Sequence, residues 1–391
     1  MHDISEEKEF LNTGSTSFLN NPYPTYSNWR LNSPVFYSPS HQAWLVTCYK
    51  DVLKVLKDPN TFSSDRPLTS SPGGLGYRFM LFSQDPPEHN HLRSVIKHAF
   101  TTRRIKEIES WANQQIELLL HALPKDSFDI ATQLTIPFPI MVVTEMLGIR
   151  QDKWQDLKRW TEMIVGHHNK DSHLLGRKAF LELHALFKNE IEIKKRKPSE
   201  DIISHLVLAE YSGGTLSDIE IINFCTTLLV AGNETTASLM SNMFNILGQN
   251  PELWERLRKD RSLVQAVVEE TLRYDSPVQY VNRTITQPVY LSGQQVNEGE
   301  TIICCLGSAN RDGDIFINPD VFDPERSQGK HLAFSHGIHF CVGAALSRME
   351  ACLVLNQALD RFHRIEISEP GSRYENMFFR GFKHLKLDVT T

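Results

Sequence analysis

A cysteine towards the C-terminal end of the chain stands among residues whose types could support chemistry. Cys341 follows the run Phe-Ser-His-Gly-Ile-His-Phe (334–340), and an apolar helical pattern follows it at Ala344–Phe362. The start of a helix favours a thiolate over a thiol, because its free N–H groups and its dipole are positive. Such a thiolate could be a nucleophile, a redox sensor, a zinc ligand or a haem ligand.

Other residues bear on the choice among these four roles. Zinc would need further Cys or His ligands at suitable spacing. Cys304 and Cys305 are adjacent in a strand-like run, so their side chains are expected to point to opposite faces, which argues against a shared site. His336 and His339 lie close to Cys341 in sequence, which leaves a cysteine hydrolase open. Taken alone, the cysteine could also be purely structural.

A second unusual segment is Ala231–Thr236 (AGNETT), in the middle of a long helix predicted over Thr215–Leu247 with a capping box at Ser217. A glycine destabilises a helix interior by about 1 kcal/mol, and a buried carboxylate costs more unless it is paired. Two interpretations follow. Either the helix reaches solvent at this point, or it opens locally to admit a ligand, with Glu234 and Thr235 handling protons.

The elements that must position these residues are mainly helices. The chain has 391 residues, of which 40% are apolar and 23% charged, so it can bury a sizeable core. Further helical patterns cover Ile105–Leu123, Trp154–Val165, Leu174–Lys195 and Pro251–Tyr274, and short strand-like runs cover Trp44–Cys48, Val289–Leu291 and Thr301–Leu306. We therefore expect a mainly α fold with small β-sheets.

Composition also narrows the function classes. A net charge of -6 argues against a general nucleic-acid binder. No apolar stretch reaches the roughly 18 residues that a membrane helix needs, so no membrane anchor is expected. Six cysteines in so long a chain do not indicate a disulfide framework. These features are typical of a reduced, cytoplasmic enzyme.

The motifs together resemble the cytochrome P450 superfamily, in its soluble bacterial form. The segment Phe334–Gly343 matches the Phe, Gly, His, Cys and Gly positions of the haem-thiolate signature. Ala231–Thr236 looks like the oxygen-activation motif of the central helix, and Glu270–Arg273 matches ExxR. Asn310–Arg326 resembles the segment that precedes the cysteine loop, and Asp85–Arg93 resembles the bacterial haem-flanking helix.

The resemblance covers roughly Asn20–Val389 and implies the cytochrome P450 fold, with haem between the long central helix and the cysteine-loop helix. Residues 1–391 would form a single domain, and residues 1–20 a flexible N-terminal segment. Site residues follow from the same resemblance. Cys341 would be the axial ligand of the iron in haem b; the haem would also be bound by His89, Arg93, Ala231, Arg283 and His339. Thr235 and Glu234 would deliver protons, whereas Glu270, Arg273 and Arg326 would form a structural network.

The implied function is a monooxygenase that hydroxylates or epoxidises a mostly apolar molecule, such as a fatty acyl, terpenoid, steroid or polyketide-like compound of secondary metabolism. It would use O2 and electrons from a ferredoxin or flavodoxin with its NAD(P)H reductase, because no flavin or iron–sulfur domain is evident. Two alternatives are a peroxygenase driven by hydrogen peroxide and a non-catalytic haem-thiolate sensor. The pair Glu234–Thr235 favours dioxygen, since family members that use peroxide often lack it.

Family topology also predicts the walls of the substrate pocket. They are expected at Pro67–Phe82, Ile164–Leu175, Val230–Ala231, Tyr280–Val281 and Met377–Phe379. The glycines and prolines of Ser64–Tyr77 suggest a lid over this pocket, and His167 and His168 could add a polar contact at its mouth.

Overall fold

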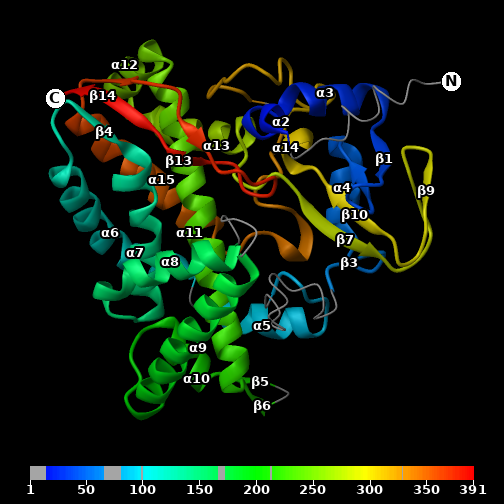
Figure 1. The fold of residues 1–391 in the computed structure, drawn as a ribbon, viewed down its shortest axis with the longest axis horizontal. Coiled ribbons are helices and arrows are strands. Elements are labelled where there is room, and N and C mark those ends of the chain that lie inside the picture. Colours follow the sequence, from blue (N-terminus) through cyan, green and yellow to red (C-terminus); the bar gives the residue numbers. More distant parts are fainter. Residues whose placement is uncertain (1–14, 66–80, 98–99, 166–171, 212–213, 328) are drawn as a thin grey trace.

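The computed structural model describes residues 15–65, 81–97, 100–165, 172–211, 214–327 and 329–391. A helix-rich part packs beside a smaller part that holds the main β-sheet, and the long helix α11 (Asp218–Gly248) runs through the middle (Figure 1). The mainly α prediction with small sheets is confirmed. The lid expected at Ser64–Tyr77, apart from its first two residues, lies outside the described residues, as do His167 and His168.

The central helix α11 forms where its sequence predicts. The Ser217 hydroxyl accepts from the Glu220 N–H while the Glu220 carboxylate accepts from the Ser217 N–H, which completes the capping box. Beyond its first turn α11 is mostly buried, and Glu234 is its one charged residue there. The helices that contact it are α7 (Pro137–Leu147), α8 (Trp154–Val165), α9 (Ser172–Arg196), α10 (Ile202–Leu208), α12 (Pro251–Lys259), α13 (Val264–Tyr274) and α15 (Ala344–Arg361). Helix α6 (Thr102–Ala122) packs against α15 and α7.

The main sheet has five strands in the order β1 (Val35–Ser38), β2 (Ala43–Val46), β10 (Thr301–Cys304), β7 (Val281–Ile285) and β3 (Phe62–Ser63). Only the β2–β10 pair is parallel. Cys304 and Cys305 are buried in different apolar clusters on the two faces, as their adjacency predicts. Smaller sheets pair β4 (Ser127–Asp129), β14 (Lys386–Thr390) and β11 (Arg364–Ile367), β5 (Glu210–Tyr211) and β6 (Gly214–Thr215), β8 (Val289–Leu291) and β9 (Gln294–Val296), and β12 (Ser372–Arg373) and β13 (Phe382–His384).

Short helices complete the fold: α2 (Thr16–Asn20), α3 (Tyr23–Asn32), α4 (Tyr49–Lys57), α5 (Glu88–Lys97) and α14 (Leu306–Ala309). Residues 1–14 lie outside the described residues, but Thr16–Asn20 is helical and Phe18 is buried, which differs from the flexible segment expected over residues 1–20. The single helix expected at Pro251–Tyr274 is also wrong. It is two helices, because the backbone of Asp260 is extended rather than helical. The Asp260 carboxylate accepts from the Ser262 N–H at 2.9 Å and caps the turn that follows.

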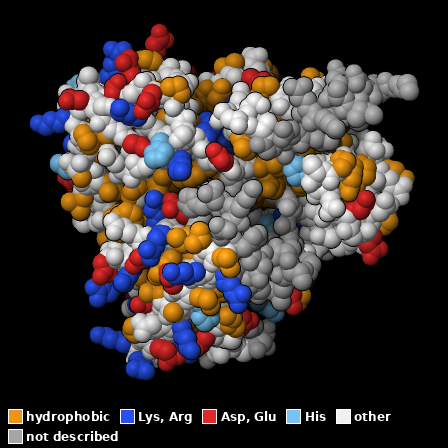
Figure 2. Space-filling view, in the orientation of Figure 1, with side chains coloured by type: hydrophobic (Ala, Val, Ile, Leu, Met, Phe, Trp, Pro, Cys, Tyr) orange, Lys and Arg blue, Asp and Glu red, His pale blue; other side chains and the backbone are white. Residues whose placement is uncertain are grey.

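Lys and Arg side chains gather on the lower part of the molecule, around α8, α9 and α10 (Figure 2). Some of them join helix ends. The Lys194 ammonium lies 2.5 Å from the carboxylate of Asp201, the N-cap of α10, and the Lys195 ammonium lies 2.8 Å from that of Asp218 at the start of α11. Cations at the end of α9 also complement its dipole.

All six cysteines lie within the described part of the chain and are free, so the expected lack of a disulfide framework is confirmed. Among the described helices, none is long and apolar enough to cross a membrane.

Candidate haem-thiolate site

The cysteine loop is held by its backbone. The Cys341 N–H donates to the Phe334 carbonyl at 3.0 Å, and a single turn at Gly337–His339 lies between them. Gly337 has a φ of +70°, and a Cβ there would lie 2.4 Å from the Leu56 carbonyl oxygen. Only glycine fits that position without strain. The loop therefore brings Cys341 to the start of α15, which begins at Ala344.

Cys341 is exposed as a residue, but its sulfur lies among many protein atoms. This partial loss of hydration raises the pKa of the thiol, whereas hydrogen bonds from the Gly343 and Ala344 backbones and the charges of Arg93 and Arg348 act to lower it. The expectation that the helix start alone favours the thiolate is therefore not met, because desolvation prevails. A bound metal cation would reverse the balance, since a coordinating thiol loses its proton.

The centre of α11 is enclosed by protein. Glu234 is only 3% exposed, so the interpretation that the helix reaches solvent there is wrong. A Cβ on Gly232 would lie 2.8 Å from a Val143 methyl on α7, which explains the small residue by close packing. The Thr235 hydroxyl donates to the Ala231 carbonyl at 2.7 Å, and that of Thr236 lies 3.2 Å from the Ser347 hydroxyl on α15. Hence AGNETT contacts the helix that follows Cys341.

Four basic side chains converge next to the cysteine loop. The rings of His89 on α5 and His339 have centroids 4.5 Å apart, and the Arg93 guanidinium donates to the Phe340 carbonyl at 2.7 Å. Burial, together with the charges of Arg283, His89 and Arg93, lowers the pKa of His339 to about 3. Among the described residues, neither the His89 Nε2 nor the His339 Nε2 has a hydrogen-bond partner, although both atoms are buried.

These four side chains fit a buried dianion. Two unpartnered imidazole nitrogens and two guanidinium groups beside Cys341 match the two propionates of a haem whose iron would be coordinated by the thiolate. The chemistry of the donor set thus agrees with haem at this place. Ala231, which is half-buried on α11, carries no polar side-chain atom and could contribute only apolar contact.

The ExxR residues lie in a buried network away from the cysteine loop. Arg273 donates from Nε and Nη2 to the two carboxylate oxygens of Glu270, at 2.8 and 2.7 Å. Arg273 also donates to the carbonyls of Asn310 and Pro319, at 2.9 and 2.8 Å. Arg326 joins through its Nε, 3.4 Å from Glu270 Oε1. The predicted pairing of Glu270 with Arg273 on one helix face is therefore observed, and it ties α13 to the segment before the cysteine loop.

Sequence reasoning missed a neighbouring ion cluster. Arg348 on α15 donates to both oxygens of Glu269, at 2.5 and 2.9 Å, and its guanidinium lies over the Phe334 ring at 4.5 Å from the centroid. His331 Nε2 lies 3.1 Å from the same carboxylate. Burial alone would raise the pKa of Glu269, but His331 and Arg348 lower it to about 2. No local signal separates Arg348 from other helical arginines, because its partners are distant in sequence.

Comparisons with known proteins agree with this geometry. The family model for cytochrome P450 matches residues 132–382. A putative cytochrome P450 of Bacillus subtilis, YjiB, is 37% identical over 98% of each chain, and erythromycin C-12 hydroxylase of Saccharopolyspora erythraea is 35% identical over 88% of each. The crystal structure of CYP109E1 from Bacillus megaterium in complex with testosterone matches with a TM-score of 0.86 at 35% identity, covering 95% of this chain and all of that one.

The fold and the cysteine site define a haem-thiolate enzyme. The chain belongs to the cytochrome P450 family, and it is a monooxygenase that uses haem, O2, a small-molecule substrate and electrons from redox partners. The peroxygenase and sensor alternatives gain no support from these relatives.

Proposed function

We propose that the protein oxidises a large, mostly apolar molecule of the size of a steroid, a terpenoid, a macrolide or a long fatty acyl chain. The observation that carries this proposal is an apolar wall formed by residues that are expected to line the pocket. The rings of Tyr280 and Phe378 lie 5.2 Å apart and those of Phe378 and Phe379 4.5 Å apart, both edge to face. Val230 and Ala231 offer small apolar side chains from α11.

Such a wall favours apolar ligands for a simple reason. Each Å² of apolar surface that a ligand buries contributes about 25 cal/mol, whereas an unpaired hydroxyl loses hydrogen bonds to water. The printed names of two relatives support the same class, because one is an erythromycin hydroxylase and the other was crystallised with testosterone. Of the other expected walls, Ile164 is buried and Leu174 is exposed, and Pro67–Met80 lies outside the described residues.

Glu234 and Thr235 are proposed to handle the protons of the reaction. When bound through the Cys341 thiolate, haem would supply the iron at which dioxygen is activated. Thr235 uses its own proton to bond the Ala231 carbonyl, so the lone pairs of its oxygen are left to accept a hydrogen bond. Glu234, buried one residue away, is the nearest acid in the sequence that could pass a proton to this site.

Electrons are proposed to come from a ferredoxin or flavodoxin with its NAD(P)H reductase. Phe340 is 41% exposed, so the cysteine loop reaches the surface. Arg93 places positive charge beside it, since its guanidinium donates to the Phe340 carbonyl. An acidic electron-transfer protein would complement this charge, which mainly accelerates association.

The remaining parts of the proposal concern the whole chain. We propose haem b, because the two histidines and two arginines suit the free propionates of that haem. We also treat residues 1–391 as one P450 domain that acts in the cytoplasm. Roles as haem partners are proposed for His89, Arg93, Ala231, Arg283 and His339, and a structural role for the Glu270–Arg273–Arg326 network.

A spin-state screen tests the substrate class. The purified holoprotein is titrated with testosterone, erythromycin and palmitic acid, and with glucose and citrate as polar controls. Large apolar compounds are expected to displace iron-bound water and shift the Soret band to the high-spin position. Turnover of the compounds that shift it is then compared with NADPH plus a surrogate ferredoxin and reductase, and with hydrogen peroxide alone. Tight shifts caused only by small hydrophilic compounds would overturn the proposal.

A further inference from the structure

One buried carboxylate holds both ends of a loop near the C-terminus. Arg373 on β12 donates from Nη2 to Asp275 Oδ2 at 2.9 Å, and Arg380 donates from Nε to Asp275 Oδ1 at 2.5 Å. Between the two arginines lies the loop 374–379, which contains the apolar wall residues Phe378 and Phe379. Burial acts to raise the pKa of Asp275, but Arg373 and Arg380 outweigh it and hold that pKa well below its usual range. The cluster therefore stays ionised at neutral pH.

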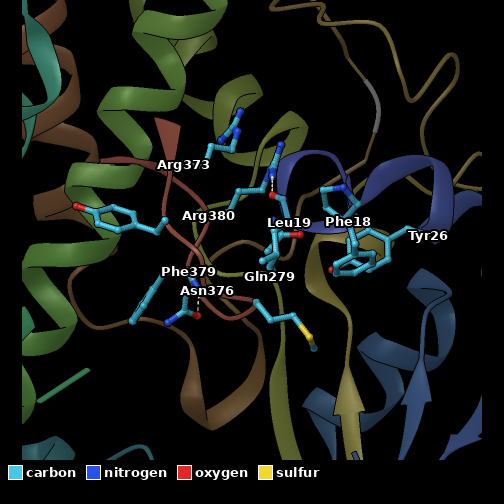
Figure 3. A pocket seen from close by; sticks show the side chains of 11 residues that line it. Phe18, Leu19, Tyr26, Gln279, Arg373, Asn376, Phe379 and Arg380 are labelled. Carbon is cyan, nitrogen blue, oxygen red and sulfur yellow. Dashed lines mark hydrogen bonds between the residues drawn. The ribbon is translucent and has the colours of Figure 1, made fainter. Parts of the chain in front are cut away.

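The same cluster reaches the N-terminal helices. The Tyr23 hydroxyl on α3 donates to Asp275 Oδ1 at 2.8 Å. Arg380 donates from Nη1 to the Leu19 carbonyl and from Nη2 to the Asn20 carbonyl, both at 3.0 Å, at the end of α2. Arg380 thus bonds α2 and Asp275 with one guanidinium. Figure 3 shows Arg380 beside Leu19 of α2. A lysine could not reproduce these bonds, because its ammonium lacks the planar fork.

Further hydrogen bonds hold the loop 374–379, both within the loop and to residues 277–279. The Asn376 carboxamide oxygen accepts from the N–H groups of Phe378 and Phe379, at 2.6 and 3.2 Å. The Phe378 carbonyl accepts from the Gln279 N–H at 2.9 Å, and the Arg380 N–H donates to the Pro277 carbonyl at 2.8 Å. The loop is therefore tied to the segment that leads into strand β7.

Just after this loop the chain meets the central helix. A Cβ on Gly381 would lie 2.3 Å from the Ser238 Oγ and 2.8 Å from its Cα, so there is no space between the two backbones for a side chain. Ser238 lies one helical turn after Glu234. A small displacement of the loop would therefore change the space beside the proposed proton-handling residues.

On its outer side the loop packs against the N-terminal helices with little free space. A cavity of about 10 Å³ is lined by Phe18 and Tyr26 and, from the loop, by Met377 and Phe379. Figure 3 shows this cavity. That volume holds about one water molecule at most. Phe18 is buried and its ring lies 5.6 Å from that of Tyr26 and 5.8 Å from that of Trp29. Met377 of the loop packs against this aromatic cluster.

We propose that Arg380 and the N-terminal helices α2 and α3 position the loop 374–379 and thereby determine which ligands fit the substrate pocket. The inference rests on the proposed function, because it requires that the loop faces substrate through Phe378, whose ring lies against Tyr280. Arg380 is then a positioning residue for specificity, and it acts through the loop. A buried ion pair is a weak source of stability but can select one conformation, which suits this role.

The test uses two azoles that bind haem iron through nitrogen. Imidazole needs no contact with the pocket wall, whereas clotrimazole fills the pocket, so the ratio of their Kd values reports on the wall. The variants are Arg380→Lys and Phe18→Ala. The control is Phe36→Ala, because Phe36 belongs to the same aromatic cluster, 5.2 Å from the Trp29 ring, but does not line the cavity against the loop.

Arg380→Lys and Phe18→Ala are expected to change the Kd of clotrimazole by about tenfold while that of imidazole changes by less than about twofold. Phe36→Ala should keep the wild-type ratio. If both test variants retain the wild-type ratio, or if Phe36→Ala shifts it equally, the inference is wrong. If Arg380→Lys binds no haem, Phe18→Ala decides. Failure of the proposed function is distinguished beforehand, since the spin-state screen of wild-type protein would then show tight shifts only with small hydrophilic compounds.

Discussion

The imidazole rings of His89 and His339 meet at a centroid distance of 4.5 Å, although one comes from α5 and the other from the cysteine loop. Their buried Nε2 atoms, which lack partners within the described part of the chain, are well placed to donate to a haem propionate. A hydrogen bond to a charged group contributes about 1.5–3 kcal/mol. His339→Phe should therefore lose haem to apomyoglobin about 10–100 times faster than wild type.

The control for that measurement is His336→Phe. His336 lies in the same loop but is exposed, so its replacement should leave the rate of haem loss unchanged. Equal rates for the two variants would show that His339 does not bind a propionate.

Cys341→Ser should abolish the red-shifted Soret band that reduced haem-thiolate proteins show with carbon monoxide. The reason is that only a thiolate ligand donates enough electron density to iron to produce it. Cys352→Ser, a half-buried cysteine further along α15, should keep the band. A Cys341→Ser protein with an unchanged band would refute the assignment of the ligand.

Thr235→Ala should uncouple electron consumption from product formation. The variant is expected to bind haem and substrate normally, while product per NADPH falls by about tenfold or more and hydrogen peroxide accumulates, because proton delivery by a positioned group is lost. Thr235→Ser retains the hydroxyl and should recover most of the coupling. Unchanged product per NADPH in Thr235→Ala would mean that protons arrive by another route.

Glu270→Ala should yield little holoprotein. The substitution leaves Arg273 and Arg326 buried without their carboxylate, and breaking one side of a buried pair typically costs about 3–5 kcal/mol. Urea unfolding of the recovered protein measures the loss in free energy of unfolding. The control is Glu252→Ala, because Glu252 is exposed on α12. A stable Glu270→Ala protein that binds haem but cannot turn over would assign Glu270 to catalysis instead.

Glu269 should contribute stability that depends on pH. Its pKa is lowered to about 2 from an unfolded value near 4.5, so its contribution is complete above about pH 4.5 and is lost as the pH falls towards 2. Because the side chain is 34% exposed, solvent screening reduces the effect to about 1–2 kcal/mol. The free energy of unfolding of Glu269→Gln, measured in urea, should be lower than that of wild type at pH 7. The difference should be much smaller at pH 3. A difference independent of pH would exclude this ionic contribution.

The sequence by itself determined the features that depend on neighbours along the chain. The capping box at Ser217, the glycine that lets the cysteine loop turn, and the one-turn spacing of Glu270 and Arg273 are all local, and each lies where the pattern predicts. Local rules misplaced the helix break at Asp260, because a single polar residue can either continue a helix or cap a new one.

Only the tertiary structure decided which distant residues meet. Tyr23, Asp275 and Arg380 come from three parts of the chain, and no periodicity relates them, since their contact depends on how α3, α13 and the β12–β13 hairpin pack. The same holds for the burial of Glu234 and for the raised pKa of the Cys341 thiol, where desolvation outweighs the helix start. Desolvation is a sum over all surrounding atoms, so it exists only once the chain has folded.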